Sequence, residues 1–208
     1  MWYPMVLTAL AGYLLGNLNG AVNISMMLSH EDVRSRGSGN AGLTNFIRNF
    51  GRGHAVWVLL IDAGKTVLSC LLGGLLLQPY GFYREGLTLG ALAVSLGHDF
   101  PAILGFRGGK GIVCGAAAAF VIDWRIGLAL LAVFALVYGI TRYVSLGSVV
   151  AAAVFILCFF LFYWGNWYLC AGGTLIGLLA IWMHRSNIHR LVRGEERKSS
   201  LFGKGKQG

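Results

Sequence analysis

Three separated segments of this sequence combine glycines, cations and small polar side chains in a pattern that suits the binding of an anion. In the first, residues 36–48, glycines alternate with polar residues ahead of an arginine. Glycines let backbone N–H groups converge on an anion because no Cβ blocks the approach, and the guanidinium fork suits phosphate oxygens. A tight turn at a membrane surface, followed by an ordinary arginine, would have the same composition. The candidate ligands here are Gly37, Ser38, Gly39, Asn40, Thr44, Asn45 and Arg48.

The second segment, residues 97–111, carries His98 and then a Gly-Gly-Lys-Gly run at 108–111, where an apolar stretch begins. At a helix N-terminus, free N–H groups, the helix dipole and a lysine together favour an anion. The run is not a P-loop, because Leu104 stands where that motif needs Gly and Gly111 stands where it needs Ser or Thr.

The third segment is split between two places in the chain. Arg142 and Ser145 flank the start of one apolar stretch, and His184 and Asn187 follow the end of the last one. In a helix, His184 and Asn187 lie on one face because they are three residues apart. The basic end of a membrane span would explain the same residues without a ligand.

The composition indicates what kind of protein positions these segments. Of 208 residues, 56% are hydrophobic and only 12% are charged, and the mean hydropathy is +0.67. A soluble domain carries about 25% charged residues. A disordered chain would be polar and highly charged, and a collagen-like chain would need a glycine triplet period and many prolines. We therefore predict an all-α, polytopic integral membrane protein.

Hydropathy predicts about seven transmembrane helices. The third and fourth apolar segments are short, since a helix of about 12 residues covers roughly 18 Å of a roughly 30 Å hydrocarbon core. A five-span alternative merges or discards this short pair and keeps both termini on the same sides. The seven segments are residues 2–28, 55–77, 86–96, 111–122, 126–141, 144–162 and 167–183.

The positive charges predict the orientation. With the N-terminus outside and the segments alternating, 14 of the 17 Lys and Arg residues fall inside, and only Arg84 and Arg125 lie outside. Cytoplasmic loops carry an excess of Lys and Arg, so the bias predicts an N-out, C-in topology. The net charge of +9 is attributed to this bias and not to nucleic-acid binding. We expect one transmembrane catalytic domain, residues 1–193, and a basic cytoplasmic tail, residues 194–208.

All three polar segments fall on the inside under this topology. Together they predict a site for one or two phosphate groups at the cytoplasmic face, with apolar walls suited to an acyl chain. The main acids near this site are Asp99 and Glu195, and no metal-ligand cluster is apparent. Asp62 and Lys65, three residues apart within a span, are expected to neutralise each other.

The three segments also contain ordered motifs. They read Gly37-Ser38-Gly39-Asn40-x-Gly42-x-Thr44-Asn45, then Gly97-His98-x-x-Pro101 with Gly108-Gly109-Lys110-Gly111, then His184-Arg185-x-Asn187-Ile188-x-Arg190-Leu191-x-x-Gly194-Glu195. In order and spacing they resemble the signature motifs of the bacterial acyl-phosphate:glycerol-3-phosphate acyltransferase family (PlsY). The resemblance implies a seven-span fold that transfers a fatty acyl group from acyl phosphate to the 1-hydroxyl of glycerol 3-phosphate. The implied products are lysophosphatidic acid and phosphate, in the first step of phospholipid synthesis.

By position, the resemblance implies catalytic roles for Ser38, Arg48, Lys110 and His184. We expect no cofactor, and no metal because the sequence shows no cluster of metal ligands. The expected partners are acyl phosphate and glycerol 3-phosphate as substrates, with membrane lipids and no nucleic acid. The implied location is the bacterial cell (inner) membrane, with the site facing the cytoplasm. The expected substrate-binding residues are Gly37, Gly39, Asn40, Thr44, Asn45, His98, Gly108, Gly109, Arg142, Ser145 and Asn187.

The sequence leaves the route of the proton open. No histidine is followed at the fifth position by aspartate, so the His-x4-Asp dyad of other glycerolipid acyltransferases is missing. His184 could be the base, or it could orient phosphate while a substrate phosphate takes the proton. We favour the second option, because nearby arginines reduce the basicity of imidazole. Ser38 as a covalent nucleophile is a third option, and a transporter for a phosphorylated or anionic small solute is the rival function.

Overall fold

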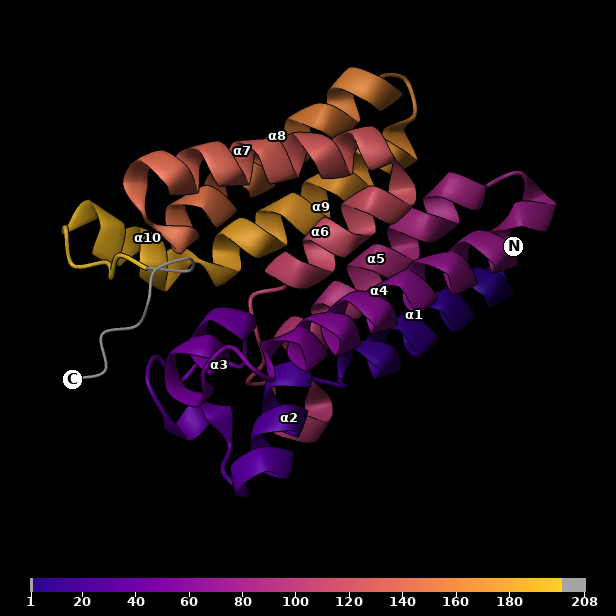
Figure 1. Ribbon diagram of the computed structural model, residues 1–208. Coiled ribbons are helices and arrows are strands. Elements are labelled where there is room, and N and C mark those ends of the chain that lie inside the picture. Colours follow the sequence, from indigo (N-terminus) through magenta and orange to yellow (C-terminus); the bar gives the residue numbers. More distant parts are fainter. Residues whose placement is uncertain (1, 200–208) are drawn as a thin grey trace.

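Helices make up the regular structure of residues 2–199, the part of the chain that the computed structural model describes (Figure 1). Short 3-10 turns, η1 (Val33–Ser35), η2 (Gln78–Tyr80) and η3 (Ala102–Leu104), lie in the connections. The predicted all-α class is confirmed. The helices are α1 (Trp2–Gly16), α2 (Gly20–Ser29), α3 (Leu43–Phe50), α4 (Ala55–Leu77), α5 (Tyr83–Asp99), α6 (Ile112–Ile122), α7 (Trp124–Thr141), α8 (Val144–Tyr163), α9 (Trp167–Met183) and α10 (Arg185–Val192).

Each of the seven predicted apolar segments overlaps with at least one helix of the bundle. Helix α9 has 17 residues, the lower end of the roughly 17–25 residues that a transmembrane helix needs, and α10 is bent from it by 56°. Helix α6 has 11 residues, so at about 1.5 Å per residue it covers roughly half of the hydrocarbon core. Within residues 2–199, five helical segments are each long and apolar enough to cross a membrane without a bent partner: Trp2–Ser29, Ala55–Tyr80, Tyr83–Leu104, Trp124–Thr141 and Val144–Tyr163.

The first span is interrupted at residues 17–19, which its hydropathy did not predict. The side chain of Asn19 caps the N-terminus of α2. The Lys65 ammonium donates to the carbonyl oxygens of Gly16 and Leu18 at 3.2 and 2.5 Å. A broken helix is tolerated at membrane depth where neighbouring groups satisfy the freed backbone, so polar side chains stabilise this break.

The third span is longer than the predicted segment 86–96. Helix α5 continues to Asp99, and its polar residues Thr88, Ser95, His98 and Asp99 are buried. Polar residues inside membrane helices face the bundle interior. They lower the hydropathy of the segment without keeping it out of the bundle, which explains the short prediction.

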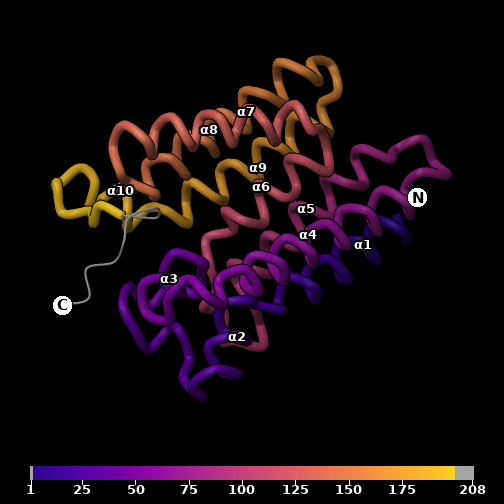
Figure 2. Tube along the Cα trace, viewed as in Figure 1, coloured from indigo at the N-terminus to yellow at the C-terminus, as the bar shows by residue number. Residues whose placement is uncertain are grey.

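Glycines bring α1, α4 and α5 into backbone contact, and the Cα trace shows these three helices side by side (Figure 2). A Cβ on Gly73 of α4 would lie 2.2 Å from the carbonyl oxygen of Gly86 of α5. One on Gly97 would lie 2.1 Å from the carbonyl oxygen of Tyr13. Small residues allow membrane helices this close approach, so these three helices form a tightly packed wall.

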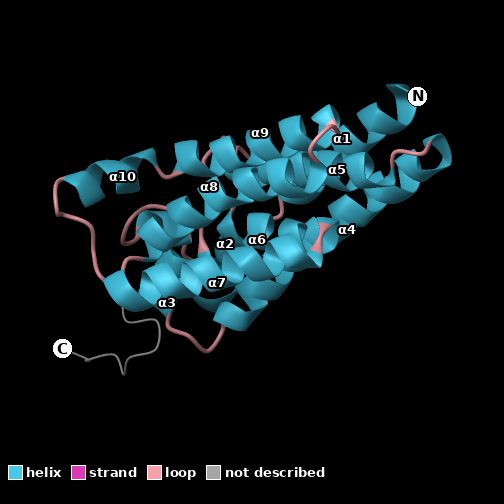
Figure 3. Cartoon of the chain, turned by 90° about the horizontal axis from the view of Figure 1, so that it is seen from above, coloured by secondary structure: helices cyan, strands magenta, loops and turns pink. Residues whose placement is uncertain are grey.

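The polar connections gather at one end of the bundle. Two views at right angles place α3 and α10 at the end opposite the N-terminus (Figures 1 and 3). The connection between α5 and α6 reaches the same end, where Arg34 Nη1 donates to the carbonyl oxygens of Leu104 and Arg107 at 2.8 and 2.9 Å. The bundle thus brings the three predicted polar segments together.

Candidate active site

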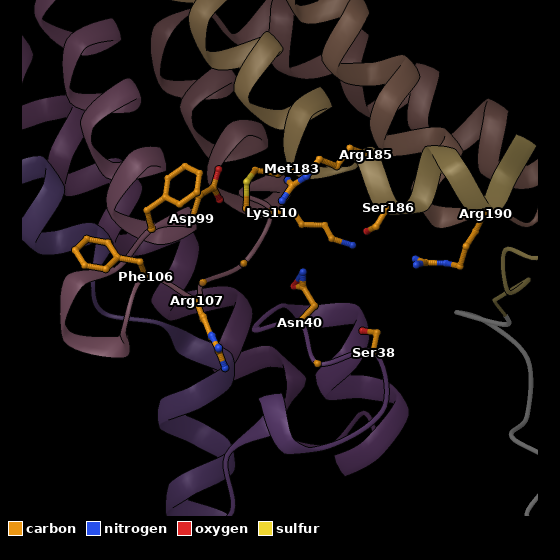
Figure 4. A pocket seen from close by; sticks show the side chains of 14 residues that line it. Ser38, Asn40, Asp99, Phe106, Arg107, Lys110, Met183, Arg185, Ser186 and Arg190 are labelled. Carbon is orange, nitrogen blue, oxygen red and sulfur yellow. The ribbon is translucent and has the colours of Figure 1, made fainter.

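A cleft of about 290 Å³ opens at this end, between the loop before α3, the α5–α6 connection and the junction of α9 with α10 (Figure 4). Phe100, Phe106 and Met183 give it an apolar part. Residues from all three polar segments meet here, as the sequence predicted. The other lining residues are Ser38, Gly39, Asn40, Asp99, Arg107, Gly108, Gly109, Lys110, Arg185, Ser186 and Arg190.

The buried side chain of Asn45 organises the loop that presents Ser38. Its Oδ1 atom accepts a hydrogen bond from the Ser38 N–H at 3.0 Å. Its Nδ2 atom donates to the carbonyl oxygens of Val33, Arg36 and Asn40 at 3.0, 3.1 and 3.0 Å. Gly37 and Gly39 take φ angles of +61° and +70°, which glycine adopts without steric cost. Asn45 therefore supports the loop from behind the cleft.

Helix α3 places Thr44 and Arg48 one turn apart, as the spacing predicted. Neither side chain lines the cleft. Partial desolvation lowers the pKa of the Arg48 guanidinium, and the charges of Arg197 and Arg190 act in the same direction, whereas Glu196 opposes them. Arg48 therefore belongs to the same group of charges as α10 and the segment that follows it.

The glycine run lies tightly against the end of α5. The N–H of Gly108 donates to the carbonyl oxygen of Asp99 at 3.2 Å, and that of Gly109 donates to the carbonyl oxygen of His98 at 3.1 Å. A Cβ on Gly109 would lie 2.1 Å from His98 Nε2, so glycine is required for this approach. The two N–H groups are thus not free to meet an anion, contrary to the sequence expectation. Substrate binding by these two residues stays a prediction.

Lys110 is the cation that this turn presents to the cleft. Its Nζ atom donates a hydrogen bond to Asn187 Oδ1, which joins the α5–α6 connection to α10. Burial lowers the pKa of Lys110 to about 8, and the nearby charges of Arg190 and Arg48 contribute, while Glu196 opposes them. The ammonium form of Lys110 therefore still dominates near pH 7, and it loses its proton as the pH rises through about 8.

His184 lies in the bend between α9 and α10, beyond the end of the α9 span. Its Nδ1 atom is 2.8 Å from the carbonyl oxygen of Ala180. Because a carbonyl only accepts, Nδ1 carries the proton and Nε2 has a free lone pair. Burial lowers the pKa of His184 to about 4 and the charge of Lys110 adds to this, against the effects of Ala180 and Glu196. The imidazole is therefore neutral near pH 7.

The acid that completes this cluster is Glu196, which the sequence analysis missed. Its side chain is 7% exposed. The Ser145 hydroxyl and the Asn187 amide both donate to Oε1 at 2.8 Å, and Arg190 Nε donates to Oε2 at 2.7 Å. Burial raises the pKa of Glu196, but these three hydrogen bonds outweigh it and lower the pKa. The start of the predicted tail is thus part of the site, whereas residues 200–208 lie outside the described residues.

Two further predicted ligands lie away from the cleft lining. Arg142 is exposed at the C-terminus of α7, with a φ of +65°. His98 is buried behind the glycine turn. Substrate binding by both stays a prediction. The cleft instead contains Arg185, Ser186 and Arg190. Both arginines belong to the third sequence motif, and Ser186 lies between them.

The residues described offer no metal site. Within residues 2–199, no group of three or more His, Cys, Asp and Glu side chains could hold a metal ion. A reaction without metal or cofactor stays a prediction.

Fold and cleft together define the class: a polytopic helical membrane protein with a cationic site at one end of its bundle. The family model described as "Glycerol-3-phosphate acyltransferase" matches residues 6–194. Relatives of that name include those of Thermoanaerobacter sp. (strain X514), 37% identical over 193 residues with 93% of this chain and 94% of the relative covered. That of Shouchella clausii (strain KSM-K16) is 38% identical over 206 residues, with 95% and 97% covered.

Solved structures agree with these relatives. The glycerol 3-phosphate form of PlsY (YgiH), an integral membrane glycerol 3-phosphate acyltransferase, matches with a TM-score of 0.86 and 30% identity over 96% of this chain and 99% of that one. Its lysophosphatidic acid form matches with a TM-score of 0.82 and 29% identity, over 93% and 94%. The chain belongs to the glycerol-3-phosphate acyltransferase family and is a multi-pass membrane enzyme.

Proposed function

We propose that this protein transfers a fatty acyl group from acyl phosphate to the 1-hydroxyl of glycerol 3-phosphate, giving lysophosphatidic acid and inorganic phosphate. The observation that carries the proposal is the convergence of Lys110, Arg185 and Arg190 on one cleft in a member of this family. Both substrates carry phosphate, which arginine forks and lysine bind well. Phe100 and Phe106 supply an apolar wall for the acyl chain.

The reaction needs positioning and charge stabilisation more than covalent chemistry. The glycerol oxygen bonds to the acyl carbonyl carbon, and the bond from that carbon to the phosphate oxygen breaks. The leaving phosphate keeps the bonding electrons. Lys110 and Arg190 stabilise the phosphate charge, and the hydroxyl of Ser38 donates a hydrogen bond to it.

The proton of the attacking hydroxyl goes to a phosphate oxygen. The alternative acceptor is the free Nε2 of His184, but a pKa of about 4 makes this imidazole a weak base. A phosphate monoester has its second pKa near 6 and is dianionic near pH 7. His184 therefore serves to orient phosphate in this mechanism.

The cleft faces the cytoplasm in this proposal, at the bacterial inner membrane with the N-terminus outside. The support is the positive charge at the cleft end, since cytoplasmic loops are enriched in Lys and Arg. In a cysteine-free background, a membrane-impermeant thiol reagent applied to whole cells should label Tyr80→Cys and spare Ser38→Cys. Labelling of Ser38→Cys from outside would contradict the orientation.

An assay with purified protein tests the function. Acyl phosphate and glycerol 3-phosphate should give equal amounts of lysophosphatidic acid and phosphate, with Lys198→Ala as an active control. Excess EDTA should leave the rate unchanged, and initial-rate plots should intersect because both substrates bind together. Glycerol 3-phosphate uptake into proteoliposomes without acyl transfer would instead identify a transporter. Parallel plots, with an acyl group trapped on Ser38, would show a covalent intermediate.

A further inference from the structure

A buried charged cluster lies behind the cleft, in the wall formed by α4 and α5. Asp62, Lys65 and His98 are 1%, 4% and 3% exposed. Lys65 Nζ lies 2.9 Å from Asp62 Oδ1 and 2.9 Å from His98 Nδ1. The predicted pairing of Asp62 with Lys65 is confirmed, but the contact with His98 was not predicted. The proposed reaction uses none of these three groups directly.

The surroundings of Lys65 determine which nitrogen of His98 carries the proton. Four groups lie within 3.2 Å of Nζ: the Asp62 carboxylate, the Nδ1 atom of His98 and the carbonyl oxygens of Gly16 and Leu18. An ammonium group only donates, so Nδ1 must accept with its lone pair. In a neutral imidazole the proton then lies on Nε2, because the contact of one ring nitrogen sets the tautomer.

The Nε2 atom faces the turn that presents Lys110. The position of a Cβ on Gly109 lies 2.1 Å from Nε2, so the imidazole lies directly against the backbone of that residue. The carbonyl oxygen of His98 also accepts the Gly109 N–H at 3.1 Å. Gly109 itself lines the cleft. One side of His98 thus touches the buried ion pair, and the other touches the active-site turn.

We infer that Lys65 is a positioning residue: together with Asp62 it holds His98 as the Nε2–H tautomer against Gly109 and so fixes where Lys110 enters the cleft. Lys65 acts through His98 and touches no substrate. The kinetic part of this inference rests on the proposed function.

The tautomer can be measured without any assay of activity. Full-length protein with ¹⁵N-labelled histidine, with the His98 signals assigned through His98→Gln, should show a protonated Nε2 and an unprotonated Nδ1. Lys65→Met should remove this tautomer and move the proton toward Nδ1, which lies 3.7 Å from the Asp62 carboxylate. A wild-type His98 protonated on Nδ1, or on both nitrogens, overturns the inference, whatever reaction the enzyme catalyses and even where Lys65→Met fails to fold.

Kinetics test the consequence for Lys110. In folded Lys65→Met protein, kcat/KM for glycerol 3-phosphate should fall about 10- to 100-fold, the range for a catalytic group displaced by about 1 Å. The matched control is Thr66→Val, which removes the neighbouring buried hydroxyl that donates to the Asp62 carbonyl oxygen. It should leave the His98 signals unchanged and kcat/KM within about twofold of the wild-type value. Lys65→Met protein with altered His98 signals and unchanged kcat/KM would overturn the positioning role.

Discussion

The two ends of the helix bundle hold polar clusters that are built in opposite ways. At the end away from the cleft, Asp123 accepts hydrogen bonds from Arg125 Nε and Nη2 at 2.9 and 2.6 Å and from the Tyr163 hydroxyl at 2.7 Å. There the acid and the cation satisfy each other. At the cleft end, the charges of Lys110, Arg190 and Arg48 all act on one another, and the carboxylate that opposes them is Glu196. Positive charge therefore exceeds negative charge in this group.

The difference lies in the balance of charge and not in the number of polar residues. A paired cluster stabilises the fold and has little capacity left for a ligand. In a cluster with surplus cations, repulsion between like charges destabilises the ligand-free protein, and a bound anion relieves that repulsion. We therefore expect substitutions at the cleft end to reduce catalysis and substitutions at the far end to reduce stability.

The largest effect should come from Lys110→Ala. Loss of this partly buried cation should cost about 2–4 kcal/mol of transition-state binding, roughly 30- to 1000-fold in kcat/KM. Steady-state rates of purified, folded variants measure it, with Lys198→Ala as the control. Near-normal kinetics for Lys110→Ala would remove the lysine from the site.

The pH dependence of kcat/KM should reflect the ionisation of Lys110. Burial lowers the pKa of Lys110 to about 8, and the charged form binds phosphate, so kcat/KM should fall as the pH rises through about 8. The limiting slope is tenfold per pH unit for a single group. Lys110→Arg keeps its charge and should move the fall to higher pH. A flat profile in the wild type up to pH 10 would contradict this assignment.

Asp123→Asn should separate the two ends. Hydrogen bonds from Arg125, with help from Tyr163, lower the pKa of Asp123 despite burial. Its carboxylate should therefore add about 1.5–3 kcal/mol of stability, present above the unfolded pKa near 3.9 and lost as the pH falls below it. Thermal unfolding in detergent should show a lower Tm for the variant at pH 7. Activity per folded molecule should stay at the wild-type level, and a loss of kcat would break the comparison.

The smallest effect is expected at Arg142. This residue is exposed at the end of α7 and does not line the cleft, so Arg142→Ala should change kcat/KM by less than about threefold. A loss of tenfold or more would restore the role in substrate binding that the sequence motif implies. It would also show that the cationic surplus extends beyond the cleft lining.

The sequence was sufficient for features that depend on local pattern. Runs of apolar residues locate the spans, and glycines beside cations locate Ser38 and Lys110. The pairing of Asp62 with Lys65 follows from their spacing on one helix. Each of these depends on residues that are close together in the sequence, where residue type and spacing already determine the geometry.

Features that depend on distant contacts were not predictable. Glu196 lies in a polar, basic stretch without periodicity, and its partner Ser145 is 51 residues away. The break at residues 17–19 is stabilised by Lys65, 47 residues away from Leu18. The N–H groups of Gly108 and Gly109 were expected to be free, because nothing in the sequence reveals that the turn folds back onto the end of α5.

The cleft is lined by both cationic and apolar side chains, so the site is accessible to water and to the lipid bilayer. Phe106, which is 63% exposed, lines the cleft together with Arg107 and Lys110. In the proposed reaction, phosphate leaves into water, whereas the acylated product keeps a chain that gains about 0.8 kcal/mol per buried CH₂ in the bilayer. The two products thus part into different phases as soon as they form. Reversal would require both products to meet again in the cleft from separate phases, so their separation disfavours the reverse reaction.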